Sequence, residues 1–129
     1  MKLKHDQHTL DAIAFAESLW NAPVSRICIE NPIGALSTKS NLGRFSQWIQ
    51  PYEFGHDASK KTCLWLKNLP PLQKTGPFIA PRIVNGKPRW ANQTDSGQNK
   101  LGPSEQRSAD RARTYSGIAL AMASQWGKL

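Results

Sequence analysis

The chain has 129 residues, with 17 Lys and Arg against 9 Asp and Glu, so its formal net charge is +8. This length fits one domain, residues 1–129, and an apolar fraction of 39% supports a modest core and argues against a wholly disordered chain. No apolar run approaches the ~18 residues of a membrane-spanning helix, and the polar N-terminus has no apolar signal-peptide region. We therefore expect no membrane association and a cytoplasmic location.

The N-terminal third of the chain predicts a helix followed by a strand. Residues 9–21 carry apolar side chains at helical spacing, with a broad face of Ala12, Phe15, Ala16, Leu19 and Trp20. Asp6 or Thr9 is the expected N-cap, and Pro23 ends the helix. Residues 26–29 then form a short run rich in β-branched side chains, which predicts a buried strand that stops at residues 30–32.

Two further strands are predicted in the middle of the chain. Residues 48–54 form a weaker candidate, and Pro51 inside it favours an edge position or a bulge because proline donates no ladder hydrogen bond. Residues 62–66 form a stronger, more apolar candidate that Pro70 and Pro71 close. A helix, a turn and apolar strands in this order are typical of an α/β fold.

Residues 73–113 are rich in Gly, Pro, Asn, Gln and Ser and predict a long irregular insertion, which is either functional or flexible. Its only strand signals are Phe78-Ile79 and Ile83-Val84, which suggest a brief strand or hairpin with Asn85-Gly86 as the turn. Residues 114–126 predict a final helix with an apolar stripe, capped by Thr114 or Ser116 and stopped by Gly127.

The charge is concentrated in the second half of the chain. Residues 1–72 carry eight basic and six acidic side chains, a net charge of +2, whereas residues 73–129 carry nine and three, a net charge of +6. A basic segment attracts polyanions, of which nucleic acid is the commonest. Five residues of the insertion are candidate phosphate contacts: Arg89, Lys100, Arg107, Arg111 and Arg113. Trp90 and Tyr115 are candidates to stack on bases. A basic surface loop without a ligand explains the same pattern equally well.

The cysteine and histidine residues indicate neither a disulfide scaffold nor a metal site. Cys28 and Cys63 both lie in apolar runs, where reduced core thiols are expected, and such thiols are poor nucleophiles. His5 and His8 form an isolated pair near a helix start, and no Cys/His cluster with zinc spacing accompanies them. We expect no metal.

Four segments in order carry a resemblance to a known group of proteins: residues 29–33 (IENPI), 49–56 (IQPYEFGH), 60–70 (KKTCLWLKNLP), and 113–127, which begins RTYSGIA. In this order they resemble the C-terminal half of phage and prophage proteins described as DNA cytosine methyltransferase-like, over nearly the whole chain from about residue 9. The resemblance implies a partial Rossmann-like, methyltransferase-type sheet of about three strands, with flanking helices and the long basic loop. It also implies DNA as the partner and S-adenosylmethionine as the cofactor.

The resemblance implies a catalytic role for Glu30. In the broader cytosine-5 methyltransferase pattern, a strand that ends in Glu-Asn presents the glutamate to the cytosine ring, and Glu30-Asn31 is the matching pair. Asn31 and Pro32 would then fix the turn after the strand. At the C-terminal end of a parallel strand, the Glu30 carboxyl would face the crevice where α/β sheets bind ligands. The alternative is that Glu30 caps the next turn and faces water.

Two parts of such an enzyme are absent from these 129 residues. No Gly-x-Gly cofactor loop and no Pro-Cys dipeptide occur, so the cofactor-binding part and the attacking thiolate are missing. We expect a DNA-modification protein of a phage in its bacterial host that is inactive alone, or half of a split enzyme. Its partner would be a chain with the N-terminal half, or a second copy paired through an exposed sheet edge. The alternative is a non-catalytic module that binds nucleic acid or protein.

Overall fold

The computed structural model describes residues 6–32, 36–100 and 114–129 of a mixed α/β chain. The chain divides into two compact units. The sheet unit comprises Met1–Ile49 and Lys61–Pro71, and the hairpin unit comprises Gln50–Lys60 and Leu72–Leu129. No helix among the described residues is both long and apolar enough to cross a membrane.

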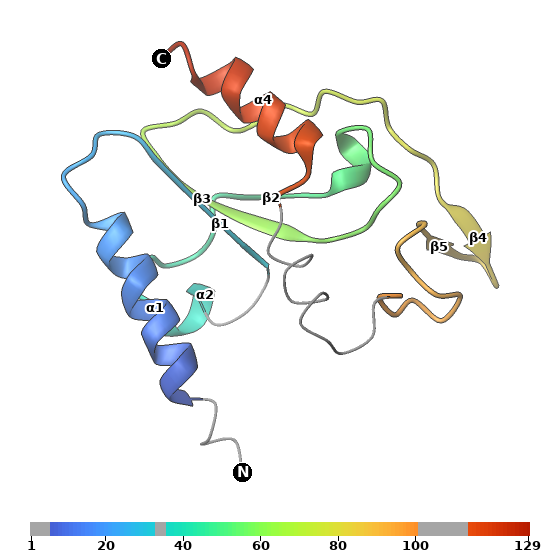
Figure 1. The fold of residues 1–129 in the computed structure, drawn as a ribbon, viewed down its shortest axis with the longest axis horizontal. Coiled ribbons are helices and arrows are strands. Elements are labelled where there is room, and N and C mark those ends of the chain that lie inside the picture. Colours follow the sequence, from blue (N-terminus) through green and yellow to red (C-terminus); the bar gives the residue numbers. More distant parts are fainter. Residues whose placement is uncertain (1–5, 33–35, 101–113) are drawn as a thin grey trace. The chain divides into compact units, whose positions relative to one another are not determined.

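The sheet unit contains the three strands that the sequence predicts: β1 (Ile27–Pro32), β2 (Gln47–Ile49) and β3 (Thr62–Lys67). They form one sheet in the order β1-β3-β2, and β3 is antiparallel to both neighbours (Figure 1). The expectation that Glu30 ends a strand with a parallel neighbour is therefore wrong for the described strands: Glu30 lies inside β1, opposite Leu64 of the antiparallel β3. The difference arises because the last strand enters between the first two.

The central position of β3 follows from its composition. Its first four residues are all buried, as expected for a strand that is covered on both faces, whereas β1 is half-buried along its described side chains. The predicted edge position of the second strand is confirmed. It ends at Ile49, and Pro51 starts the 3-10 helix η1 (Pro51–Glu53) instead of continuing the strand.

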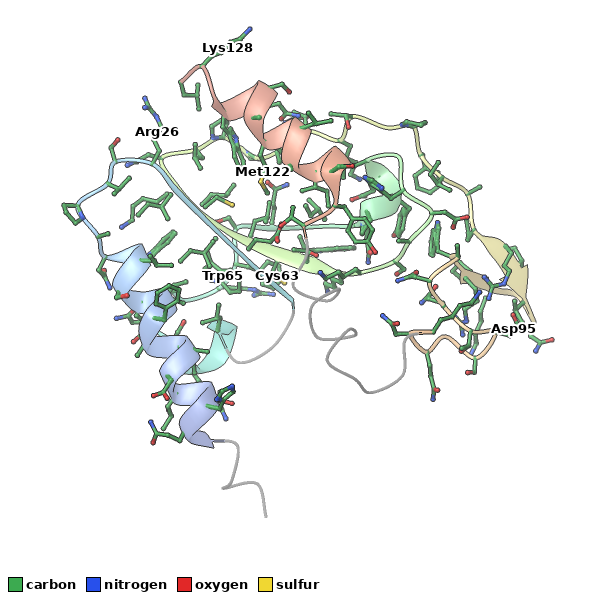
Figure 2. The ribbon with its side chains drawn as sticks, in the orientation of Figure 1. Arg26, Cys63, Trp65, Asp95, Met122 and Lys128 are labelled. Carbon is green, nitrogen blue, oxygen red and sulfur yellow. The ribbon has the colours of Figure 1, made fainter. Side chains whose placement is uncertain are left out.

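Helix α1 (Asp6–Trp20) packs beside β1, where it contributes Ile13 and Ala16 to the core of the sheet unit (Figure 1). The same core contains Cys63 and Trp65, which share one face of β3 (Figure 2). The predicted apolar face is only partly buried: Ala16 lies in the core, whereas Phe15 and Leu19 are 65% and 44% exposed. Thr9 is not the N-cap, because the helix begins three residues earlier.

Besides η1, the hairpin unit contains two short strands, β4 (Arg82–Val84) and β5 (Lys87–Arg89). The predicted strand signal at Phe78-Ile79 is not part of either strand. The predicted turn at Asn85-Gly86 is confirmed: both residues have positive φ, 51° and 78°, as a two-residue type I′ turn requires. The register places Arg82 directly opposite Arg89. This pairing positions the pocket described below.

The sheet unit also contains a short helix, α2 (Leu36–Lys39). Helix α4 (Ser116–Trp126) is the last element of the hairpin unit and confirms the predicted helix. The cap prediction is wrong, because the N-cap residue of α4 is Tyr115 and its side chain makes no capping hydrogen bond. One backbone amide of the first turn, that of Gly117, instead donates a hydrogen bond to Nε2 of His56 at 2.9 Å. The helix ends, as predicted, at Gly127.

Candidate functional site

An apolar groove of about 550 Å³ lies between α1 and β1 in the sheet unit. From β1 it is lined by Ile29 and Glu30, and from α2 by Leu36. The rest of its lining comes from α1: His8, Thr9, Ala12, Ile13, Phe15, Ala16 and Leu19. The predicted catalytic residue thus borders a groove, and the predominantly aliphatic walls provide an environment of low polarity beside its carboxyl group.

Asn31 and Pro32 do not form the predicted turn. Strand β1 continues through both of them, with Asn31 opposite Cys63 and Pro32 opposite Thr62. Proline is tolerated here because β1 is an edge strand of the sheet as the structure describes it. Their role is therefore to extend the strand beyond Glu30.

The thiol of Cys28 shares one side of β1 with Glu30, because side chains alternate along a strand. Burial, followed by the negative charge of Glu30, raises the pKa of the Cys28 thiol to about 12. Burial also raises the pKa of the Cys63 thiol, although Lys61 opposes this shift. A thiol that is protonated at neutral pH is a poor nucleophile, so neither cysteine suits covalent attack on a base.

Alkylation should therefore be slow at Cys28. With a pKa of about 12, instead of the ordinary 9.0, the thiolate fraction at pH 9 falls on the order of hundreds-fold. We expect iodoacetamide to modify Cys28 of the folded chain at pH 9 correspondingly more slowly than in the urea-unfolded chain, as measured by peptide mapping. Because folding raises this pKa, the folded state loses stability as the pH rises from about 9 towards 12. Equal rates in the folded and unfolded chains would contradict this environment for Cys28.

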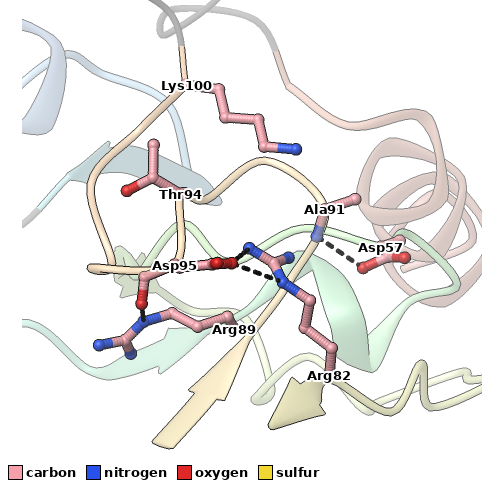
Figure 3. Close-up of a pocket in the computed structure, with 7 residues that line it drawn as sticks. All are labelled: Asp57, Arg82, Arg89, Ala91, Thr94, Asp95 and Lys100. Atoms are coloured by element: carbon pink, nitrogen blue, oxygen red, sulfur yellow. Dashed lines mark hydrogen bonds and ion pairs between the residues drawn. The ribbon is translucent and has the colours of Figure 1, made fainter. Parts of the chain in front are cut away.

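A second, polar pocket of about 460 Å³ lies in the hairpin unit (Figure 3). It brings together Arg89 and Lys100, two of the five residues predicted to contact phosphates, and adds Arg82. Its remaining lining residues are Asp57, Ala91, Thr94 and Asp95. Three cationic and two anionic side chains give the pocket a formal net charge of +1, so an anion of single charge would balance it.

The two arginines of this pocket hold the loop that follows β5. Arg82 forms an ion pair with Asp95 at 3.1 Å and donates to the carbonyl oxygens of Trp90 and Gln93 at 2.9 and 2.7 Å. Arg89 donates from Nε to the carbonyl oxygen of Asp95 at 3.1 Å (Figure 3). These bonds also explain how two like charges can stand directly opposite each other in the hairpin, an arrangement that is otherwise destabilising.

The loop is held from the other side by a segment more than thirty residues earlier. The Asp57 carboxylate accepts a hydrogen bond from the Ala91 amide at 2.8 Å (Figure 3). Asn92 pairs with the Ser59 backbone through two hydrogen bonds, of 2.9 and 2.8 Å. The walls of the pocket are therefore fixed before any ligand arrives.

The stacking role predicted for Trp90 is wrong. Its side chain is buried, its ring stacks on Tyr52 at a centroid distance of 3.9 Å, and its Nε1 donates to the carbonyl oxygen of Ile79 at 2.7 Å. Trp90 thus anchors residues 73–100 instead of presenting a face to a base. Tyr115 is half-buried beside His56. Arg107, Arg111 and Arg113 lie outside the described residues.

One member of the pocket could have been found from the sequence. A two-residue turn at Asn85-Gly86 pairs Val84 with Lys87, so the same count pairs Arg82 with Arg89. Asp57 carries no comparable signal, because its contact with Ala91 joins two irregular segments that are 34 positions apart in the sequence. Among the residues that the structure describes, no group of three or more His, Cys, Asp or Glu side chains could hold a metal ion.

Comparisons with known proteins identify no relative: no family model, no curated protein and no solved structure matches the chain.

Proposed function

We propose that this chain is part of a DNA cytosine methyltransferase-like DNA-modification protein of phage type, and that it supplies the side of the site that faces the base. The observation that carries the proposal is the direction of the strands. β1 and β2 run the same way, and β3 is inserted between them in the opposite direction. Many doubly wound sheets add an antiparallel strand at the edge of an otherwise parallel sheet. The resemblance implies a Rossmann-like sheet, and in this proposal the three described strands, whose two pairings are both antiparallel, form an antiparallel end of such a sheet.

Glu30 is the residue that this proposal makes catalytic. Methyl transfer to carbon 5 of cytosine requires a thiolate that attacks carbon 6, a bound methyl donor and an acid near N3. The protonated Glu30 carboxyl would donate a hydrogen bond to N3 of a flipped cytosine and stabilise the charge that develops on the ring. Its position beside a groove with mostly apolar walls supports this role, because electrostatic stabilisation is stronger in surroundings of low polarity.

The thiolate and the methyl donor must come from residues other than these 129. The sequence has no Pro-Cys dipeptide and no Gly-x-Gly loop, and both of its cysteine thiols have raised pKa values. In this proposal a second polypeptide segment supplies the S-adenosylmethionine site and the nucleophile. The edge of the sheet at β1 is the place for it, since an apolar edge strand can pair with another strand. A second copy of the chain would use the same edge.

Methyl transfer in a divided system tests this function. The chain is mixed with labelled S-adenosylmethionine and cytosine-containing duplex DNA, alone or with a polypeptide that carries a Gly-x-Gly loop and a Pro-Cys dipeptide from the same genome. We expect label in the DNA only when both polypeptides are present, and none with either one separately. Transfer by the chain alone would overturn the account of its missing parts, and the absence of transfer from the complete mixture would overturn the proposal.

A non-catalytic nucleic-acid-binding module is the second candidate. It is favoured by the pocket of Arg82, Arg89 and Lys100 and by the net charge of +6 over residues 73–129. This candidate predicts salt-sensitive DNA binding with no methyl transfer in any combination of polypeptides. The two functions therefore differ in the outcome of the divided assay.

A further inference from the structure

We propose that the polar pocket of the hairpin unit binds one phosphate group of a DNA backbone, with the Lys100 ammonium as its mobile cation. This inference rests on the proposed function only for the identity of the nucleic acid. The pocket itself is defined by Arg82, Arg89 and Lys100, which carry more positive charge than Asp57 and Asp95 can balance.

The three cations differ in how far they are already engaged. Most guanidinium N–H groups of Arg82 and Arg89 donate hydrogen bonds to backbone carbonyl oxygens of residues 88–96 or to the Asp95 carboxylate. These two side chains therefore form fixed walls of the pocket. The Lys100 side chain is exposed and makes no hydrogen bond or ion pair with the part of the chain that the structure describes. Its backbone, in contrast, is anchored by a 3.0 Å hydrogen bond from its amide to the Asn92 carbonyl oxygen. A tethered backbone with an unengaged ammonium is suited to meet an incoming anion.

The surroundings of the pocket favour a phosphodiester chain over a small free anion. Residues 82–89 contain three basic and no acidic side chains, and Lys87 projects from the same hairpin as an exposed residue. The pocket therefore lies at the base of a basic hairpin, which can follow a backbone that presents phosphates at regular intervals. A single phosphodiester carries one negative charge, which matches the formal net charge of +1 in the pocket.

Binding of a labelled 20-base-pair duplex, followed by fluorescence anisotropy over a series of KCl concentrations, tests the site. Lys100→Gln is the test variant, and Lys128→Gln is the matched control, because Lys128 is also exposed in the hairpin unit but does not line the pocket (Figure 2). Both variants remove one positive charge, and neither removes a hydrogen bond or ion pair within the part of the chain that the structure describes. Circular dichroism confirms that both are folded.

We expect Lys100→Gln to weaken binding about threefold to tenfold and to reduce the salt slope by about one, the change for one lost phosphate contact. Lys128→Gln should leave both quantities close to those of the parent chain. Equal losses in the two variants would show that only overall charge matters and would overturn the site, as would an unchanged Lys100→Gln or a parent chain that does not bind the duplex. The methyl-transfer assay tests the proposed function separately, so a failure of this phosphate site is distinguishable from a failure of that function.

Discussion

Replacement of Trp65 by alanine should destabilise the sheet unit by about 3–5 kcal/mol, the range for removing a large aromatic side chain from a core. Trp65 is 1% exposed, and its ring meets Phe45 edge-on at a centroid distance of 6.2 Å. Its Nε1 donates a hydrogen bond to the Gly43 carbonyl oxygen at 2.9 Å. The substitution therefore removes packing, an aromatic pair and a hydrogen bond from the same place.

Trp48→Ala is the matched control, since it makes the same chemical change on a neighbouring strand. Trp48 is 48% exposed, and the Lys61 ammonium lies 4.7 Å from the centroid of its ring. Exposed contacts of this kind are worth about 0.5–1 kcal/mol. Urea denaturation monitored by circular dichroism measures both variants. Similar losses for the two tryptophans would contradict the position assigned to β3 at the centre of the sheet.

A loss of several kcal/mol is a large fraction of the stability of a small domain, which is typically about 5–15 kcal/mol. Trp65→Ala is therefore expected to remove much of the margin of stability of the sheet unit. Because Glu30 lies opposite Leu64, the residue before Trp65, the arrangement of the groove depends on this packing. Any activity that depends on Glu30 should be lost together with the fold.

The sequence was sufficient for the elements whose signals are local. The Asn85-Gly86 turn specified the hairpin, and the apolar run of residues 62–66 specified the buried strand, because turn geometry and burial depend on neighbouring residues. The edge position of β2 followed from Pro51 for the same reason.

Features that depend on contacts between distant residues could not be predicted from local sequence patterns. The direction of the strands depends on how the chain returns between β1 and β2, which periodicity does not encode. Phe15 and Ala16 lie on the same predicted apolar face of α1, yet only Ala16 is buried in the core and Phe15 is exposed. Trp90 carries the same local pattern as an exposed stacking residue, and only its contacts with Tyr52 and Ile79 show that it is buried.

The placement of residues 73–100 gives the same lesson for the candidate site. Composition predicted an irregular segment, and the described part is largely without regular structure outside the hairpin. It is nevertheless held by specific long-range bonds, such as those from Asp57 to Ala91 and between Ser59 and Asn92. Pairs of this kind join a side chain to the backbone of a distant segment and leave no periodic pattern in the sequence.

The most direct measurement of the central claim is the effect of Glu30→Gln on methyl transfer in the divided system. A glutamine keeps the size of the side chain but cannot deliver a proton to N3, and loss of such an acid typically costs about 10²–10⁴-fold in rate. We expect kcat to fall by about 100-fold or more while duplex affinity and the folded state are unchanged. Glu17→Gln, on α1 and away from the groove, should retain the parent rate. A Glu30→Gln variant as active as the parent would contradict the assignment of this chain to the base-facing side of a methyltransferase.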